Sequence, residues 1–170
     1  MNDDGLAARA ATGDAAAFGQ LVRRHQSVLR GFLLRLTRGN AALADDLAQD
    51  SFVEAWRKLA QFRREGSFRG WLMRIAYTRY LMEARRKKLE SLDEQAETAE
   101  RNDGLEPGVR FDLERCMAKL SIGERAALTL CYALGHSNDE AAEILEMPVG
   151  TLKSHVLRGR KKLLAMLESE

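Results

Sequence analysis

The sequence is poor in the residues that build disulfide-rich or metal-bound scaffolds. It has two cysteines, Cys116 and Cys131, and three histidines among 170 residues. These show no recognised zinc-ligand spacing and cannot form a disulfide framework. No run approaches the roughly 18–20 apolar residues that span a bilayer, and no secretory signal is visible. The sequence therefore argues against a secreted miniprotein, a membrane protein and a zinc finger, and it predicts a reducing, cytoplasmic setting.

Proline and β-branched residues are also scarce, which favours helices over strands. The chain has two prolines, and Ala, Leu, Arg and Glu dominate its composition. Apolar residues recur at three- and four-residue steps from Phe18 to Leu36. Further helices are expected over about 41–59 and from residue 69 or 70 to about 88, with a loop at 62–68 between them. The sequence predicts an all-α fold.

Charge is distributed unevenly along the chain, although the net charge is +2. Residues 21–88 carry sixteen Lys or Arg and six Asp or Glu, whereas residues 89–111 carry seven acids and two arginines. Such asymmetry indicates nucleic-acid contact, although solvated arginine-rich helix faces would look the same. The acidic stretch has few large apolar residues, so we interpret 91–110 as a linker between helical domains at 1–90 and 111–170.

The second domain carries the pattern of a helix-turn-helix. Residues 121–124 and 137–140 each fit a capping box, in which a serine and a glutamate satisfy the first amides of a helix. A turn with proline and glycine follows at 147–150. Thr151 is expected to cap a longer, basic helix that ends near Leu167. This order is typical of DNA-binding domains, although an ordinary terminal helix can also have a basic face.

Two segments resemble known sequences at this point. The segment SNDEAAEILEMPVGTLKSHVLRGRKKL resembles the fourth domain of a bacterial sigma factor, and LADDLAQDSFVEAWRKLAQFRREGSFRGWLMRIA resembles the second domain of the same family. They occur in the family's order and are separated by the acidic linker. Over about residues 10–167 the chain resembles a two-domain extracytoplasmic-function sigma factor of group IV of the sigma-70 family.

The resemblance implies a function that composition could not reveal. Such a protein binds the clamp and the flap of core RNA polymerase, directs it to the −10 and −35 elements of promoter DNA, and helps to open the duplex. It is not an enzyme and needs no cofactor or metal. The resemblance also implies control by an anti-sigma factor, and we expect a monomer when the protein is free.

The resemblance assigns binding roles to three sets of residues. Carboxylates on the second predicted helix would pair with arginines of the polymerase clamp. Alternatively, these carboxylates form an ordinary acidic helix face that contacts only solvent. The loop at 62–68 and the following helix would capture bases and hold the backbone of the −10 element. The last helix would read the −35 element.

The expected clamp-binding residues are Asp45, Asp46, Gln49, Asp50 and Glu54. The expected −10 residues are Phe62, Gly66, Ser67, Phe68, Arg74, Tyr77, Thr78, Arg79, Arg85 and Arg86. The expected −35 residues are Thr151, Lys153, Ser154, His155, Arg158 and Lys161.

The chain departs from the family's pattern in the −10 helix. After Ile-Ala the family carries an Arg-Asn pair and, four residues after the Asn, an Asp. This chain has Tyr77-Thr78 and Met82, so we expect an altered −10 preference. For Phe68, core packing beside Trp71 is the favoured alternative to base capture. Tyr77 is expected either to stack on bases or to pack on the first long helix.

Three other functions compete with the sigma factor interpretation. A sigma-like decoy would bind an anti-sigma factor without driving transcription. The basic last helix and the acidic second helix count against it, and the altered Tyr77–Met82 stretch is the one point in its favour. A plain helix-turn-helix regulator would leave the acidic second helix unexplained. An enzyme is disfavoured because the sequence has no glycine-rich phosphate loop and no recognisable catalytic constellation.

Overall fold

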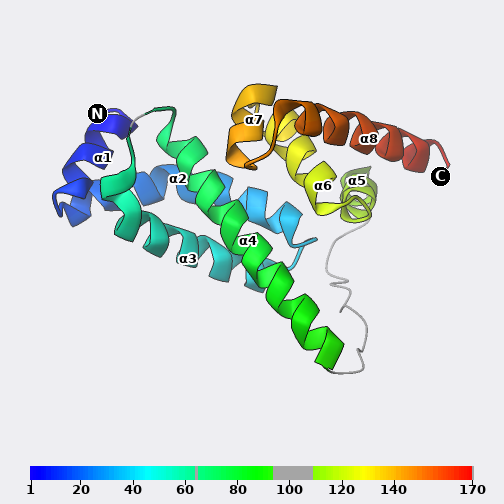
Figure 1. Cartoon of the computed structure of the whole chain (residues 1–170), viewed down its shortest axis with the longest axis horizontal. Helices are drawn as coiled ribbons and strands as arrows, with labels where there is room; N and C mark the ends of the chain where they lie inside the picture. The colour runs from blue at the N-terminus through cyan, green and yellow to red at the C-terminus, as the bar shows by residue number, and fades with distance from the viewer. Residues whose placement is uncertain (64, 94–108, 170) are drawn as a thin grey trace.

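The computed structural model describes residues 1–63, 65–93 and 109–169, and this part of the chain contains helices and turns but no strand (Figure 1). The prediction of an all-α fold is confirmed. The elements are α1 (Asp3–Ala11), α2 (Ala15–Leu36), α3 (Ala41–Lys58), the 3-10 turn η1 (Leu59–Gln61), α4 (Phe68–Asp93), α5 (Val109–Ala118), α6 (Ile122–Leu128), the π turn η2 (Thr129–Ala133), α7 (Asn138–Ile144) and α8 (Val149–Glu168).

The N-terminal half is a bundle of α1 to α4 built by short polar caps and a leucine-rich core. Asn2, Asp14 and Asn40 each accept a hydrogen bond from an amide in the first turn of α1, α2 and α3. The core includes Leu21, Leu29 and further leucines of α2, all buried. Its apolar burial is the main force that holds the helices together.

Two features of this half differ from the sequence analysis. Helix α1 was not expected, and Asp3 ties it to α2 through His25 (2.7 Å) and Arg24 (2.9 Å). Helix α4 continues to Asp93, five residues beyond the expected end. Its last turns carry exposed Leu89 and Leu92, so no buried apolar stripe marks where this helix ends.

The C-terminal half confirms both capping boxes. In α6 and α7 the hydroxyl of Ser121 or Ser137 accepts from the amide of the glutamate three residues later, whose carboxylate accepts in return. The expectation that Thr151 caps α8 was wrong: Pro148 is the N-cap residue, and Thr151 lies in the first turn. Proline at this point already has the extended backbone that an N-cap requires, so the helix begins three residues earlier than a cap at Thr151 would place it.

The two halves pack against each other along α4 (Figure 1). Helix α7 contacts α4, and α6 contacts α2. Arg125 of α6 is 1% exposed and donates to the carbonyl of Leu36, the last residue of α2, at 3.1 Å. The predicted acidic linker lies mostly outside the described residues, so the packed helices themselves place one half on the other.

Candidate polymerase and DNA interfaces

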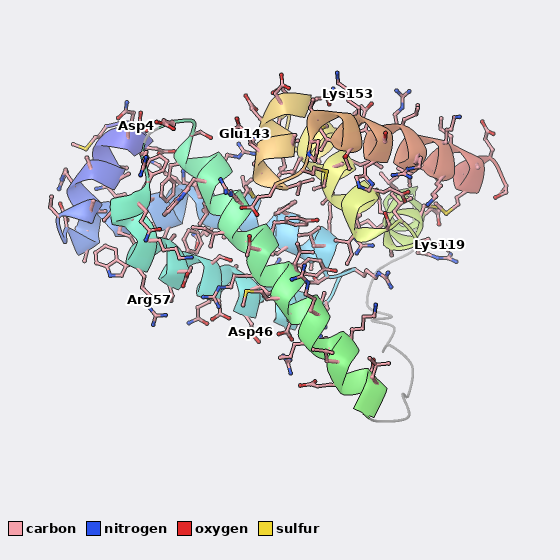
Figure 2. All side chains as sticks on the ribbon, in the orientation of Figure 1. Asp4, Asp46, Arg57, Lys119, Glu143 and Lys153 are labelled. Carbon is pink, nitrogen blue, oxygen red and sulfur yellow. The ribbon has the colours of Figure 1, made fainter. Side chains whose placement is uncertain are left out.

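Helix α3 presents an acidic face formed by Asp45, Asp46, Gln49 and Asp50, all exposed. Asp45 pairs with Arg30 of α2 at 2.6 Å, whereas Asp46 and Asp50 make no ion pair in the described part of the chain. Figure 2 shows Asp46 on the outer side of α3. The unpaired carboxylates are therefore available to a cationic partner.

Glu54 is placed differently from the rest of the predicted clamp-binding set. Its carboxylate is 17% exposed and lies 2.8 Å from Lys58 and 2.9 Å from Arg79 of α4. Hydrogen bonds from Lys58 and Arg79 lower the pKa of Glu54. Glu54 thus joins α3 to α4, and it also engages Arg79, a residue expected on the −10 surface.

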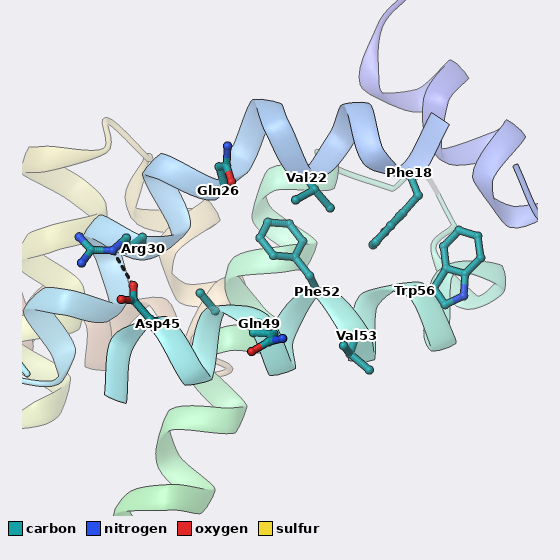
Figure 3. Close-up of a pocket in the computed structure, with 10 residues that line it drawn as sticks. Phe18, Val22, Gln26, Arg30, Asp45, Gln49, Phe52, Val53 and Trp56 are labelled. Atoms are coloured by element: carbon teal, nitrogen blue, oxygen red, sulfur yellow. Dashed lines mark hydrogen bonds and ion pairs between the residues drawn. The ribbon is translucent and has the colours of Figure 1, made fainter. Parts of the chain in front are cut away.

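An open groove of about 490 Å³ runs between α2 and α3 beside the acidic face (Figure 3). Aromatic and apolar side chains from both helices face one another across it, and the Arg30–Asp45 pair closes one end. Phe18 and Trp56 meet edge-on, with ring centroids 4.9 Å apart. Apolar periodicity predicts the two helices but does not reveal the groove between them. The lining residues are Phe18, Val22, Gln26, Arg30, Asp45, Ala48, Gln49, Phe52, Val53 and Trp56.

The loop at 62–68 rests on an aromatic cluster. Phe68 is 1% exposed, and its ring lies 5.8 Å from Phe62, 5.8 Å from Trp71 and 5.4 Å from His25 between centroids. Phe68 therefore belongs to the core, which was the favoured alternative, while Phe62 is half-buried. The exposed part of the loop carries Gly66, which has φ of +102°, a conformation that favours glycine.

The exposed side of α4 forms a basic surface, and Ser67 lies just before this helix. The Ser67 hydroxyl accepts from the Gly70 amide at 3.0 Å, which secures the start of the helix. Arg74, Thr78 and Arg85 are exposed. Arg86 is also exposed, but it pairs with Glu83 and Glu90 of the same helix, and its positive charge is thus partly neutralised locally.

The two tyrosines of α4 are hidden in this arrangement. Tyr77 is 6% and Tyr80 is 8% exposed. Burial raises the pKa of Tyr77. The Tyr80 hydroxyl lies 3.5 Å from the Arg125 guanidinium of α6. Neither ring is accessible for stacking on bases while the two halves remain packed.

Helix α8 presents a second basic surface that faces away from the N-terminal half. Figure 2 shows Lys153 projecting from the outer side of α8. The exposed residues of the predicted −35 set are Thr151, Lys153, Ser154, Arg158 and Lys161. Leu152 on the opposite side is fully buried, as the apolar spacing predicts.

His155 lies at the edge of this surface rather than on it. Its ring is half-buried against α6, where a Cβ on Gly123 would lie 2.8 Å from it. Arg158 approaches the His155 ring at 3.5 Å. Glycine at 123 thus leaves room for the imidazole to pack between α6 and α8. The ring in turn contacts the Arg158 guanidinium.

Glu124 joins the capping box of α6 to the end of α8. Its side chain is 4% exposed and accepts from Lys162 at 2.9 and 3.0 Å and from the Ser121 amide at 3.1 Å. Burial opposes ionisation of Glu124, but the hydrogen bonds from Lys162 and Ser121 outweigh it and lower its pKa. Lys162 of the basic last helix is therefore engaged within the protein.

The lowered pKa of Glu124 predicts a pH-dependent stability. Because the folded pKa lies below the unfolded value of about 4.3, ionised Glu124 stabilises the fold fully above that value. The stabilisation is lost as the pH falls through the folded pKa. Urea unfolding of the Glu124→Gln variant should show a smaller loss of stability between pH 5 and pH 3 than the parent; equal losses would contradict this role.

Two residues with cross-domain contacts were not found from the sequence. Arg125 lies among alanines and leucines, and no motif signals its role. For Glu146 the sequence gives a partial indication, because this residue occupies the turn before α8, where glycine is common. Its φ is +53°, and its carboxylate pairs with Arg74 at 2.5 Å. Among the described residues no group of three or more His, Cys, Asp or Glu could hold a metal ion, and no helix is long and apolar enough to cross a membrane.

Family models match both halves of the chain. Sigma-70 region 2 matches residues 21–90, and Sigma-70 region 4 matches residues 110–163. The RNA polymerase sigma factor CnrH of Cupriavidus metallidurans is 35% identical over 184 aligned residues, covering 97% of this chain and 94% of that protein. The ECF RNA polymerase sigma-E factor of Haemophilus influenzae is 31% identical, covering 96% of this chain and 94% of that protein.

Solved structures of sigma factors have a similar fold to this chain. CnrH in complex with the cytosolic domain of CnrY has a TM-score of 0.73 and 31% identity, covering 99% of this chain and 98% of that chain. The sigma factor RpoE of Bartonella quintana, bound to the anti-sigma factor NepR, has a TM-score of 0.76 and 28% identity, covering 89% and 96%. With region 2 and region 4 in order and relatives matched over almost their full length, the chain belongs to the extracytoplasmic-function RNA polymerase sigma factors, non-enzymatic proteins that initiate transcription through RNA polymerase.

Proposed function

We propose that this sigma factor binds the clamp of core RNA polymerase through the acidic face of α3 and contacts promoter DNA through two basic surfaces. A domain of residues 1–90 would carry the clamp-binding face and the −10 surface, and a domain of residues 111–170 the −35 surface. The observation that carries the proposal is the exposure of acids on α3 together with bases on α8, on outer sides of the two halves (Figure 2).

Two properties of the acidic face support the clamp assignment: its negative charge, and the lack of ion pairs at Asp46 and Asp50 in the described part of the chain. Asp46 and Asp50 are exposed on successive turns of one helix, and guanidinium groups bind carboxylates in two parallel hydrogen bonds. Glu54 differs, since Lys58 and Arg79 already hold it. We therefore assign Glu54 the role of holding α4 against α3, and Asp46 and Asp50 the direct contact.

The −10 surface would combine the 62–67 loop with the exposed side of α4. Gly66 and Ser67 are exposed and allow a nucleotide to approach the backbone closely. Arg74, Thr78 and Arg85 would hold phosphates and base edges. Because Thr78 offers one hydroxyl where the family has an amide, the −10 sequence preferred by this protein would differ from the family's common one.

The −35 surface would use α8 as a recognition helix in the major groove. We expect Arg158→Ala to weaken binding to the cognate −35 element by about 1–3 kcal/mol and to relax specificity at one position, as for loss of a bidentate arginine–guanine contact. Fluorescence anisotropy with the cognate duplex and single-base variants measures both effects. An equal loss on every sequence would instead make Arg158 a phosphate contact.

We also propose a protein partner and a free state. One similar solved structure holds the anti-sigma factor NepR, and another holds the cytosolic domain of CnrY. We infer that an anti-sigma factor regulates this protein and that the free chain is a monomer in the cytoplasm. Light scattering of the free protein tests the monomer, and co-purification with a tagged candidate inhibitor tests the partner.

Transcription of genomic DNA by bacterial core RNA polymerase, with and without this protein, tests the proposed function. We expect new 5′ ends that share upstream −35 and −10 elements. Core binding without any new start would favour the sigma-like decoy. Neither binding nor new starts would contradict the proposal, and a palindromic binding site would favour a plain helix-turn-helix regulator.

A further inference from the structure

Helix α1 lies next to the loop that the proposed function assigns to the −10 element. Besides α2, it contacts η1 and α4, the two elements that flank residues 62–67. Leu6, Ala7 and Ala10 of α1 are buried in the core of the N-terminal half. The helix is therefore an integral part of this half, although the polymerase and DNA contacts proposed above do not include it.

Asp3 connects the start of α1 to α2 through two hydrogen-bond donors. The His25 imidazole is 8% exposed, and its Nε2 donates to the Asp3 carboxylate at 2.7 Å. Arg24 donates to the same carboxylate at 2.9 Å and to the Met1 carbonyl at 2.8 Å. Burial opposes ionisation of Asp3, but the hydrogen bonds from Arg24 and His25 outweigh it and lower its pKa. An ionised carboxylate thus holds α1 on α2 by charge-assisted hydrogen bonds.

The ring of His25 extends this connection to the aromatic cluster at the base of the loop. Its centroid lies 5.4 Å from that of Phe68, the first residue of α4, and the two ring planes are tilted by 49°. Phe68 in turn meets Phe62, at the other end of the loop, with centroids 5.8 Å apart. The exposed residues 65–67 lie between these two phenylalanines. Asp3, His25 and Phe68 therefore form one line of contacts from α1 to the base of the loop.

We propose that Asp3 and His25 are positioning residues for the −10 loop, which hold Phe68, and through it residues 65–67, in the conformation that receives an unstacked base. This inference rests on the proposed function, because the conformation of the loop matters only if the loop captures a base. A site that receives a flipped base must be shaped to fit it, and such a shape is kept by neighbours that packing and hydrogen bonds lock in place. Helix α1 lies outside the residues 21–90 that match sigma-70 region 2, so part of this support comes from a segment that the family model does not include.

Asp3→Ala and Asp4→Ala form a matched pair that tests the packing. Both remove an acid from the first turn of α1, so both change the net charge and the interaction with the helix dipole equally. The difference is that Asp4 makes no ion pair in the described part of the chain, whereas Asp3 makes two. In a Trp56→Phe background the single tryptophan is Trp71, whose ring lies 5.8 Å from that of Phe68. We expect acrylamide to quench Trp71 about twofold more efficiently in Asp3→Ala than in Asp4→Ala, because the cluster is loosened. Equal quenching in the two variants would overturn the proposal.

Opening of promoter DNA tests the functional part of the proposal. The full chain is bound to core RNA polymerase, and the probe is a promoter found by mapping new 5′ ends, with 2-aminopurine in its −10 element. We expect Asp3→Ala to slow opening about fivefold relative to Asp4→Ala, while both keep a core affinity within about twofold of the parent. Loss of an acid by itself favours DNA binding, so slower opening is not a charge effect. Asp3→Asn keeps an oxygen acceptor for both donors and should recover most of the rate. If Asp3→Ala opens the promoter as fast as Asp4→Ala, the positioning role is wrong.

Substitutions at the two donors distinguish a route through His25 from a general loosening of α1. His25→Phe keeps a ring beside Phe68 but removes the nitrogen that holds Asp3. In this background Asp3→Ala should change the opening rate less than about twofold, because the connection is already broken. In an Arg24→Ala background it should keep its full effect. A full effect in both backgrounds would overturn the route through His25. The proposed function fails separately, by a lack of new transcription starts from the parent protein, and the quenching of Trp71 still tests the packing in that case.

Discussion

Replacing Asp46 and Asp50 together with arginine is expected to lower the affinity for core RNA polymerase by at least about 100-fold. Both carboxylates are exposed on α3 and make no ion pair in the described chain, so the fold does not depend on them. On the proposed clamp assignment, the substitution would remove two favourable pairs with the clamp and place two cations against its arginines. Close charge pairs at interfaces contribute several kcal/mol, and repulsion adds to the loss.

The matched control is a double reversal on the other half of the chain. Glu143 and Glu168 are exposed acids of α7 and α8, and their replacement by arginine changes the net charge equally. Core affinity, measured by competition with a labelled sigma factor, should stay within about twofold of the parent for this control. Circular dichroism checks that both variants fold. Unchanged core affinity of the Asp46→Arg, Asp50→Arg variant would contradict the clamp assignment.

Replacing Phe68 with alanine is expected to destabilise the N-terminal half by about 3–5 kcal/mol, the usual cost of emptying a buried aromatic site. Phe68 is 1% exposed and contacts Phe62, His25 and Trp71. Its removal empties the space between these three rings. Urea unfolding followed by Trp71 fluorescence measures the loss in a Trp56→Phe background.

Phe62→Ala provides the comparison, because Phe62 is half-buried in the same cluster. Its loss of stability should be smaller, since it forfeits less buried apolar surface. A stable Phe68→Ala variant that fails to open promoter DNA would assign Phe68 to base capture instead. A strongly destabilised one places the residue in the core and leaves the exposed part of the loop to meet DNA.

Sequence patterns predicted most of the helices because their ends carry local chemistry. The capping boxes at Ser121 and Ser137 mark the starts of α6 and α7. The residues Gly39-Asn40, which disfavour a continuous helix, separate α2 from α3. Helix α1 escaped prediction because its nine residues are mostly alanine, acid and glycine, with no long apolar stripe. The predicted cap at Thr151 was wrong because threonine is a common N-cap residue, whereas here the backbone of Pro148 sets where α8 begins.

The interfaces were less predictable, because they depend on contacts distant in sequence. The acidic and basic faces follow from helical periodicity. The engagement of Glu54 by Arg79, of Lys162 by Glu124 and of Arg74 by Glu146 spans 25, 38 and 72 residues. Nothing local marks such pairs. Likewise, the burial of Tyr77 and Tyr80 depends on where the second half docks.

The ion pair between Glu54 and Arg79 has a consequence for how this protein tolerates mutation. Glu54 lies at the end of the acidic face, and Arg79 lies on the helix assigned to the −10 surface, 2.9 Å away. Residues that share a partner show non-additive effects. A substitution at Glu54 frees a cation on α4, and its effect on promoter choice will depend on the residue at 79. On the proposed assignments, a change at Glu54 shifts both the α3 face and the α4 surface through Arg79, so polymerase affinity and promoter preference would be epistatic and would evolve together.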